Sequence, residues 1–202
     1  AYDGVVRINE IAAIGTVKNY TVEKGDFSNE KIASIGKSLI SNKVASFRSA
    51  SGVKSGFRSV INEKINGKYR YSDIGVTDGD NETLNCVNMC GTKETGESVR
   101  LDFYYKLDGK YCINKFLVNS QRNVRGLEMG KFDIYVSNDI NALFLPKSKV
   151  VSFDNTSSSE EGTSVSNLIT LEGDGVIGKY VCFSFYCHYS DFEYAKSRWG
   201  LN

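Results

Sequence analysis

The stretch Lys131-Phe132-Asp133-Ile134-Tyr135-Val136-Ser137 decides the fold class of this chain. Its apolar residues Phe132, Ile134 and Val136 fall on every second position, which is the period of a β-strand with one face toward a core. The turn signal Asn138-Asp139 follows directly and predicts the end of the strand. The stretch therefore predicts a strand of a sheet that covers a hydrophobic core.

Strand-like runs continue on both sides of this stretch. They cover residues 99–104, 112–119, 149–153, 167–171 and 179–187. Connections rich in Asn, Gly, Ser and Asp separate them, as expected for turns. Strands at this spacing predict an all-β fold, either an antiparallel β-sandwich or a jelly roll.

The N-terminal third is less regular. Residues 5–14 are rich in β-branched side chains and predict one strand. Residues 16–37 read as a connector, in which Ser28 caps a short helix. Residues 46–71 lack a sustained period and predict long loops with short strands.

Length and charge limit the possible functions. The 202 residues fit one domain, and 25 basic against 24 acidic side chains give a net charge of +1. This balance provides no electrostatic signature for nucleic acid or for an acidic membrane, so neither partner is expected. No apolar run approaches the roughly 20 residues of a membrane helix. Because the chain begins without Met and without a signal-peptide pattern, we expect a piece of a larger protein.

A turn around Asp78 gathers hard oxygen ligands. Asp78 and Asp80 supply carboxylates, Thr83 supplies a hydroxyl, and Gly79 allows a sharp bend. The turn is not an EF-hand, because Thr83 stands where that loop needs Gly and Met89 where it needs Glu. From composition alone, a calcium loop of another type and an ordinary turn both fit.

Residues 173–178 match the pattern G-x-G-x-x-G. A dinucleotide site would need a helix directly after this pattern, so that the helix N-terminus meets the pyrophosphate. Here the strand-like run 179–187 follows instead. The pattern therefore predicts a hairpin loop.

The five cysteines and the single histidine form no recognised site. Their spacings are not those of common structural zinc sites, and Cys182 and Cys187 fall on opposite faces if they share a strand. Buried thiols or one cross-loop disulfide are favoured over zinc. Since His188 is the only histidine and no local nucleophile signature accompanies it, no catalytic triad can be nominated.

An aromatic and polar cluster follows the last predicted strand. Its members are His188, Tyr189, Phe192, Tyr194, Arg198 and Trp199. In a loop, these rings and donors would suit stacking on a sugar face and hydrogen bonding to its hydroxyl groups. Capping of the core by Phe192 and Trp199 is an equal alternative.

Several of these pieces, in this order, resemble a discoidin domain. They are residues 38–40, 45–51, 76–80, 99–103, 111–118, 130–139 and 178–181. The discoidin or coagulation-factor type C family includes many bacterial galactose-binding-like carbohydrate-binding modules. The resemblance spans residues 38–202, and its most specific pieces are the turn 77–80 and the strand end 135–139.

The resemblance implies a jelly-roll sandwich with one structural calcium. Its calcium ligands carry over to Asp78, Asp80 and Thr83. A further ligand in the family is a Glu on a closing strand, and residues 6–15, which contain Glu10, look like that strand. Residues 1–15 are therefore either the tail of a preceding repeat or a strand that closes this sandwich. The second explanation is favoured, and it places Glu10 beside Asp78.

The resemblance also implies where a sugar would bind. The matching positions are Arg122, Asn123, Arg125, His188, Tyr194 and Trp199. The expected function is that of a non-catalytic, calcium-stabilised carbohydrate-binding module, secreted or at the cell surface, beside other modules of the same parent chain. An adhesion or assembly module that contacts protein or lipid is the alternative, and an enzyme ranks behind both.

Overall fold

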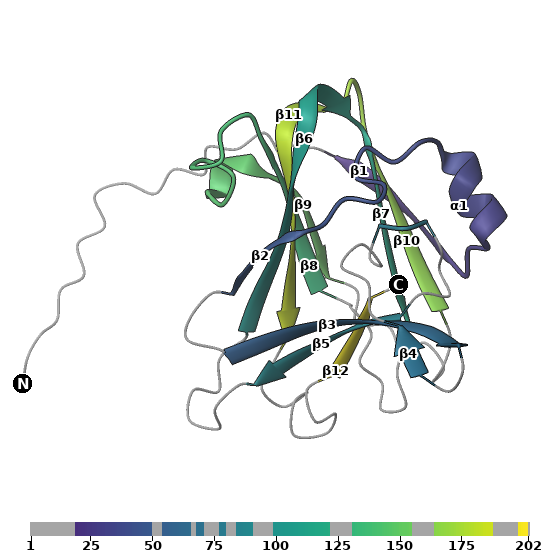
Figure 1. Cartoon of the computed structure of the whole chain (residues 1–202). Helices are drawn as coiled ribbons and strands as arrows, with labels where there is room; N and C mark the ends of the chain where they lie inside the picture. The colour runs from purple at the N-terminus through teal and green to yellow at the C-terminus, as the bar shows by residue number, and fades with distance from the viewer. Residues whose placement is uncertain are drawn as a thin grey trace, which may run out of the picture.

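A computed structural model shows two antiparallel β-sheets with little helix (Figure 1). It describes residues 19–49, 54–65, 68–70, 77–79, 84–90, 99–121, 131–154, 164–187 and 198–201. Within these ranges, no helix has the length and apolar character that crossing a membrane requires. The predicted all-β antiparallel sandwich is thus confirmed.

The first sheet has seven strands in the order β1-β10-β7-β12-β5-β3-β4. In this order, the strands are β1 (Tyr20–Gly25), β10 (Ser164–Leu171), β7 (Lys115–Gln121), β12 (Arg198–Leu201), β5 (Leu84–Cys90), β3 (Lys54–Ile65) and β4 (Lys68–Arg70). The second sheet has five strands in the order β2-β6-β11-β8-β9. They are β2 (Ser46–Ser49), β6 (Val99–Ile113), β11 (Val176–Cys187), β8 (Lys131–Ser137) and β9 (Lys149–Asp154). Helix α1 (Asn29–Ile35) and the 3-10 helix η1 (Pro146–Ser148) complete the fold.

The main core lies between strands β7 and β10 of the first sheet and strands β6, β11, β8 and β9 of the second sheet. Phe132 and Ile134 of β8 are fully buried there, and Phe132 stacks on Phe153 with ring centroids 4.8 Å apart. Strand β8 has the bounds that the alternating stretch predicts. Burial of its apolar face confirms the alternation as the signal of a core-facing strand.

The other face of the second sheet is also partly covered. The segment 138–148 packs Leu143 against this face, where Tyr135 and Cys182 are buried. Phe144 of the same segment meets Tyr104 edge to face, with ring centroids 5.4 Å apart. As a result β8 is buried on both faces at its centre, although its sequence predicts only one apolar face.

The expected connector 16–37 contains regular structure where it is described. Strand β1 pairs with β10 at the edge of the first sheet, and most of its residues are exposed. An edge strand bonded on one side needs no apolar alternation, so its polar sequence gives no strand signal. Helix α1 agrees with the predicted cap, because the Lys31 N–H donates to Ser28 Oγ at 3.3 Å.

Two connections and one strand differ from what the sequence predicts. Residues 173–178 do not close a hairpin, because β10 and β11 belong to different sheets. Strand β11 already begins at Val176, which leaves no helix for a dinucleotide. The run 112–119 is not one strand, since the chain changes sheet at Asn114. Strand β3 has 12 residues, longer than the short strands predicted for 46–71.

We expect Gly178→Ala to destabilise the fold. Gly178 is buried in β11, and a β-carbon there would overlap Val136 Cγ1. Overpacking of this kind costs about 1–3 kcal/mol of unfolding free energy, measurable by urea denaturation. Adding Val136→Ala should recover part of the loss, so that the two substitutions are not additive.

Gly109→Ala is the matched control, because its nearest neighbour, Tyr111 Cε2, lies at an ordinary 3.4 Å. Equal unfolding free energies for Gly178→Ala and Gly109→Ala would contradict the prediction.

Candidate functional site

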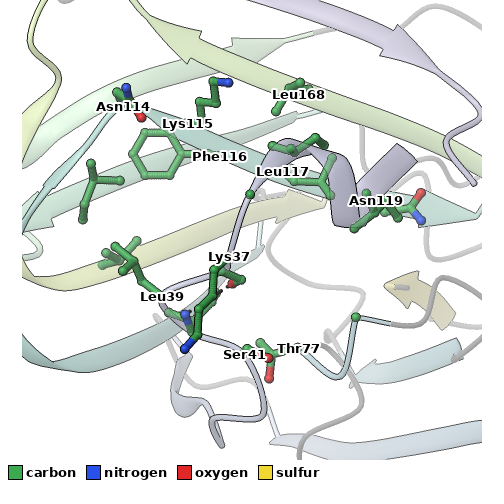
Figure 2. A pocket seen from close by; sticks show the side chains of 18 of the residues that line it. Lys37, Leu39, Ser41, Thr77, Asn114, Lys115, Phe116, Leu117, Asn119 and Leu168 are labelled. Carbon is green, nitrogen blue, oxygen red and sulfur yellow. Dashed lines mark hydrogen bonds between the residues drawn. The ribbon is translucent and has the colours of Figure 1, made fainter. Parts of the chain in front are cut away.

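A pocket of about 430 Å³ opens between the two sheets, next to the end of α1 (Figure 2). One wall consists of residues 112–117 together with Asn119. The opposite wall consists of residues 36–41 and 77–79. The second wall therefore includes Asp78, which belongs to the turn that the sequence analysis considered as a calcium site.

A glycine at the end of α1 and two hydrogen bonds to the bend 77–79 shape the second wall. Gly36 ends α1 with φ +131°, a conformation that residues with a side chain rarely adopt. After it, the Asn42 N–H donates to the Thr77 carbonyl at 2.8 Å, and the Thr77 hydroxyl donates to the Lys43 carbonyl at 2.9 Å. These two bonds join segments 34 positions apart and hold the bend 77–79 against the chain that follows α1.

The pocket has an apolar base and a polar rim. Val181 and Phe183 of β11 line its base and are buried. Lys37 and Lys115 on the rim are exposed, while Asp78 is half-buried. Such a surface suits a small polar ligand that also has an apolar face.

The predicted calcium site is described only at Asp78. Gly79 has φ +84°, which gives the sharp bend that the turn requires. Asp80, Thr83 and Glu10 lie outside the described residues. Among the residues that are described, no group of three or more His, Cys, Asp or Glu could hold a metal. A half-buried carboxylate at a bend is a donor of the kind that calcium prefers, so calcium stays a prediction.

Most of the predicted sugar-binding residues also lie outside the described ranges. They are Arg122, Asn123, Arg125, His188 and Tyr194. Trp199 lies within strand β12, opposite Val87 of β5, and not in the loop that the sequence suggested. Its stacking role stays a prediction, now for a position inside a sheet.

A row of buried polar residues on the second sheet was not predicted. Asp102, Ser184 and Asp133 lie directly opposite one another on β6, β11 and β8. All three are buried, and the Ser184 hydroxyl donates to Asp102 Oδ1 at 2.5 Å. In the sequence both Asp residues occupy polar positions of alternating strands, which predict exposure, so no local signal distinguishes them.

Asp133, at the β8 end of this row, has three polar partners. Lys149 Nζ lies 2.7 Å from Asp133 Oδ2, and the hydroxyl groups of Ser152 and Tyr135 donate to the carboxylate at 2.7 and 3.1 Å. Burial raises the pKa of Tyr20, whose hydroxyl donates to the Ser152 carbonyl, and the charge of Asp133 adds to this rise. Since the carboxylate is paired and hydrogen-bonded, we interpret the row as structural.

The described thiols are separate from one another. Cys182 is buried and Cys112 is exposed, and neither forms a disulfide. Cys182 and Cys187 share strand β11, the arrangement that the sequence analysis considered. The side chains of Cys86, Cys90 and Cys187 lie outside the description.

Comparisons with known proteins give a likeness of fold. No family model and no curated protein matches the chain. Among solved structures, it is similar to the CBM32-1 and CBM32-2 domains of Clostridium perfringens ZmpB in complex with GalNAc, at 12% identity and a TM-score of 0.42, covering 95% of this chain and 40% of that one. For ZmpB with its M60 catalytic domain, the identity is 10%, the TM-score 0.48 and the coverages 96% and 17%.

A third similar structure is the family 32 CBM of C. perfringens NanJ in complex with galactose. Its identity is 9% and its TM-score 0.39, and the match covers 74% of this chain and 88% of that one. The chain thus spans less than half of either ZmpB structure. The neighbours are carbohydrate-binding modules of family 32.

Proposed function

We propose that this chain is a non-catalytic carbohydrate-binding module of a larger extracellular protein. The observation that carries the proposal is the antiparallel sandwich itself, which is the fold that the discoidin resemblance of the sequence implies. The two most specific pieces of that resemblance also occupy defined places. The turn at Asp78 lines the pocket, and the strand end 135–139 closes β8 in the core sheet.

Recognition would combine stacking with hydrogen bonding. An aromatic ring of Trp199 or Tyr194 covers the apolar face of a sugar, while Arg122, Asn123, Arg125 and His188 select among its hydroxyl patterns. No catalytic role is assigned, because the chain has a single histidine and no nucleophile signature. The structural neighbours that were solved with sugars hold galactose or GalNAc, so glycans ending in these sugars are the first probes.

Glycan binding is tested with the native chain, Trp199→Phe and Trp199→Ala on an array that includes plant, host and microbial glycans. An aromatic contact is worth about 0.5–1.5 kcal/mol, so Trp199→Ala should weaken binding up to about tenfold. Trp199→Phe keeps a ring and should retain most of the affinity.

Circular dichroism of each variant separates loss of binding from loss of fold. A native chain that binds no glycan would contradict the proposal and would favour an adhesion module that contacts protein or lipid. Unchanged affinity in a folded Trp199→Ala variant would remove Trp199 from the site.

We also propose that one structural calcium binds at Asp78. A ligand that binds only the folded state at 100 times its Kd adds about 2.7 kcal/mol of stability. The melting temperature should therefore be higher in calcium than in EDTA, and Asp78→Asn should abolish the difference. Asp108→Asn, at an exposed position of β6, is the control and should keep it. Identical melting of the native chain in calcium and EDTA would contradict this proposal.

A further inference from the structure

The apolar lining of the pocket extends from the core of the sandwich to the protein surface. Phe116 and Phe183 form its inner part; both are buried and belong to the main core. The half-buried Ile35 at the end of α1 and Leu39, which is 37% exposed, form its outer part. Covering such exposed apolar surface with an apolar ligand is favourable. The lining therefore offers a hydrocarbon group contacts both at the surface and toward the core.

The inner part of the pocket selects against a strongly polar ligand. The side chains of Phe116, Phe183 and Val181 provide no hydrogen-bond partner for a hydroxyl group. A hydroxyl group that leaves water without gaining a partner costs free energy. A sugar, which carries hydroxyl groups around its ring, therefore suits this part of the pocket less well than an aliphatic chain does.

The charges at the rim favour an anion. Among the described lining residues, the charged side chains are those of Lys37, Lys115 and Asp78. Lys115 lies on β7 and Lys37 on the opposite wall, and both are exposed (Figure 2). Two positive charges against one negative charge leave a formal charge of +1, which a cation at Asp78 would increase. An anionic group is therefore attracted to the rim, where its charge also stays in contact with water.

We propose that the pocket binds a free single-chain amphiphile with an anionic head, such as a fatty acid. At 430 Å³, the pocket has the volume of about 14 water molecules of about 30 Å³ each, which suits a chain of about ten carbons. The chain would lie along the apolar lining, and the carboxylate would remain at the rim beside Lys37 or Lys115. This site goes beyond the proposed sugar binding, which rests on other residues.

Cys112 provides a reporter for the pocket. Its side chain is exposed and lines the pocket, where its thiol donates to the Asp174 carbonyl. The thiol of Cys182, by contrast, is buried. Decanoate in the pocket should therefore slow the alkylation of Cys112, measured by mass spectrometry of the peptide that contains it. Unchanged alkylation of Cys112 at saturating decanoate would contradict the proposal.

Titration calorimetry of the native chain with hexanoate, octanoate and decanoate, each below its micelle concentration, tests the chemistry of the ligand. If the chain enters the apolar lining, each added methylene should tighten binding by up to about fourfold, the value for complete burial. Decylamine has the same chain length and the opposite charge, and it should bind about two- to fivefold more weakly than decanoate. Galactose should not displace decanoate.

Two pairs of variants place the ligand in the pocket. Lys115→Gln should weaken decanoate binding about two- to fivefold, whereas Lys147→Gln, at an exposed position of η1 outside the pocket, should not. Leu39→Ser should weaken it at least about threefold, whereas Val44→Ser, at a side chain that is 61% exposed and outside the pocket, should not. Circular dichroism shows whether each variant is folded.

Decanoate that does not bind, binds no better than decylamine, or is displaced by galactose overturns the proposal. Equal effects of Leu39→Ser and Val44→Ser overturn it too. Binding to phosphatidylglycerol vesicles without binding to free decanoate would also overturn it, because the chain would then recognise a membrane surface. Decanoate binding by a chain that binds no glycan would support this site while contradicting the proposed function, so the two failures are distinguishable.

Discussion

The contact between Phe116 and Phe183 joins the two sheets of this protein. Phe116 belongs to β7 of the first sheet and Phe183 to β11 of the second, and their rings meet edge to face with centroids 6.3 Å apart. Phe183 also meets Tyr105 of β6 in the same manner, at 6.5 Å. Both phenylalanines line the pocket as well as the core. The packing that stabilises the sandwich therefore also forms the base of the candidate site.

Strands with one face toward this core were predictable, because their alternation is local. β8, β9 and β11 follow the expected runs, and the Ser28 cap predicts α1. β1 and β12 were not predictable, since both are specified by pairing with strands distant in sequence and not by their own pattern. The burial of Asp102 and Asp133 was missed for a different reason: the segment 138–148, which directly follows β8, folds back over this sheet face, and the alternation within each strand gives no sign of that packing.

Of the candidate site, only the turn at Asp78 could be predicted from the sequence. The turn at Asp78 carries a sequence signal because glycine and short polar side chains favour a bend. The pocket beside it carries none, because its walls come from α1, the Asp78 bend and the junction of β6 with β7. The physical reason is that a cavity depends on which strand edges stay unpaired, and pairing is a property of the assembled sheet.

Two passages between the sheets meet at one end of the sandwich. At Asn114 the chain leaves β6 for β7, and the Asn114 carbonyl accepts a hydrogen bond of 2.8 Å from the N–H of Leu171, the last residue of β10. Gly175, on the second passage, lies so close to Ile113 that a β-carbon would be 2.5 Å from the Ile113 carbonyl oxygen. The pocket wall that starts here thus continues into paired strands of both sheets, whereas the wall at Thr77 is a bend held by two hydrogen bonds from a neighbouring segment. We therefore expect the pocket to widen for a larger ligand by movement of the wall at Thr77, while the wall formed by residues 112–117 stays in place.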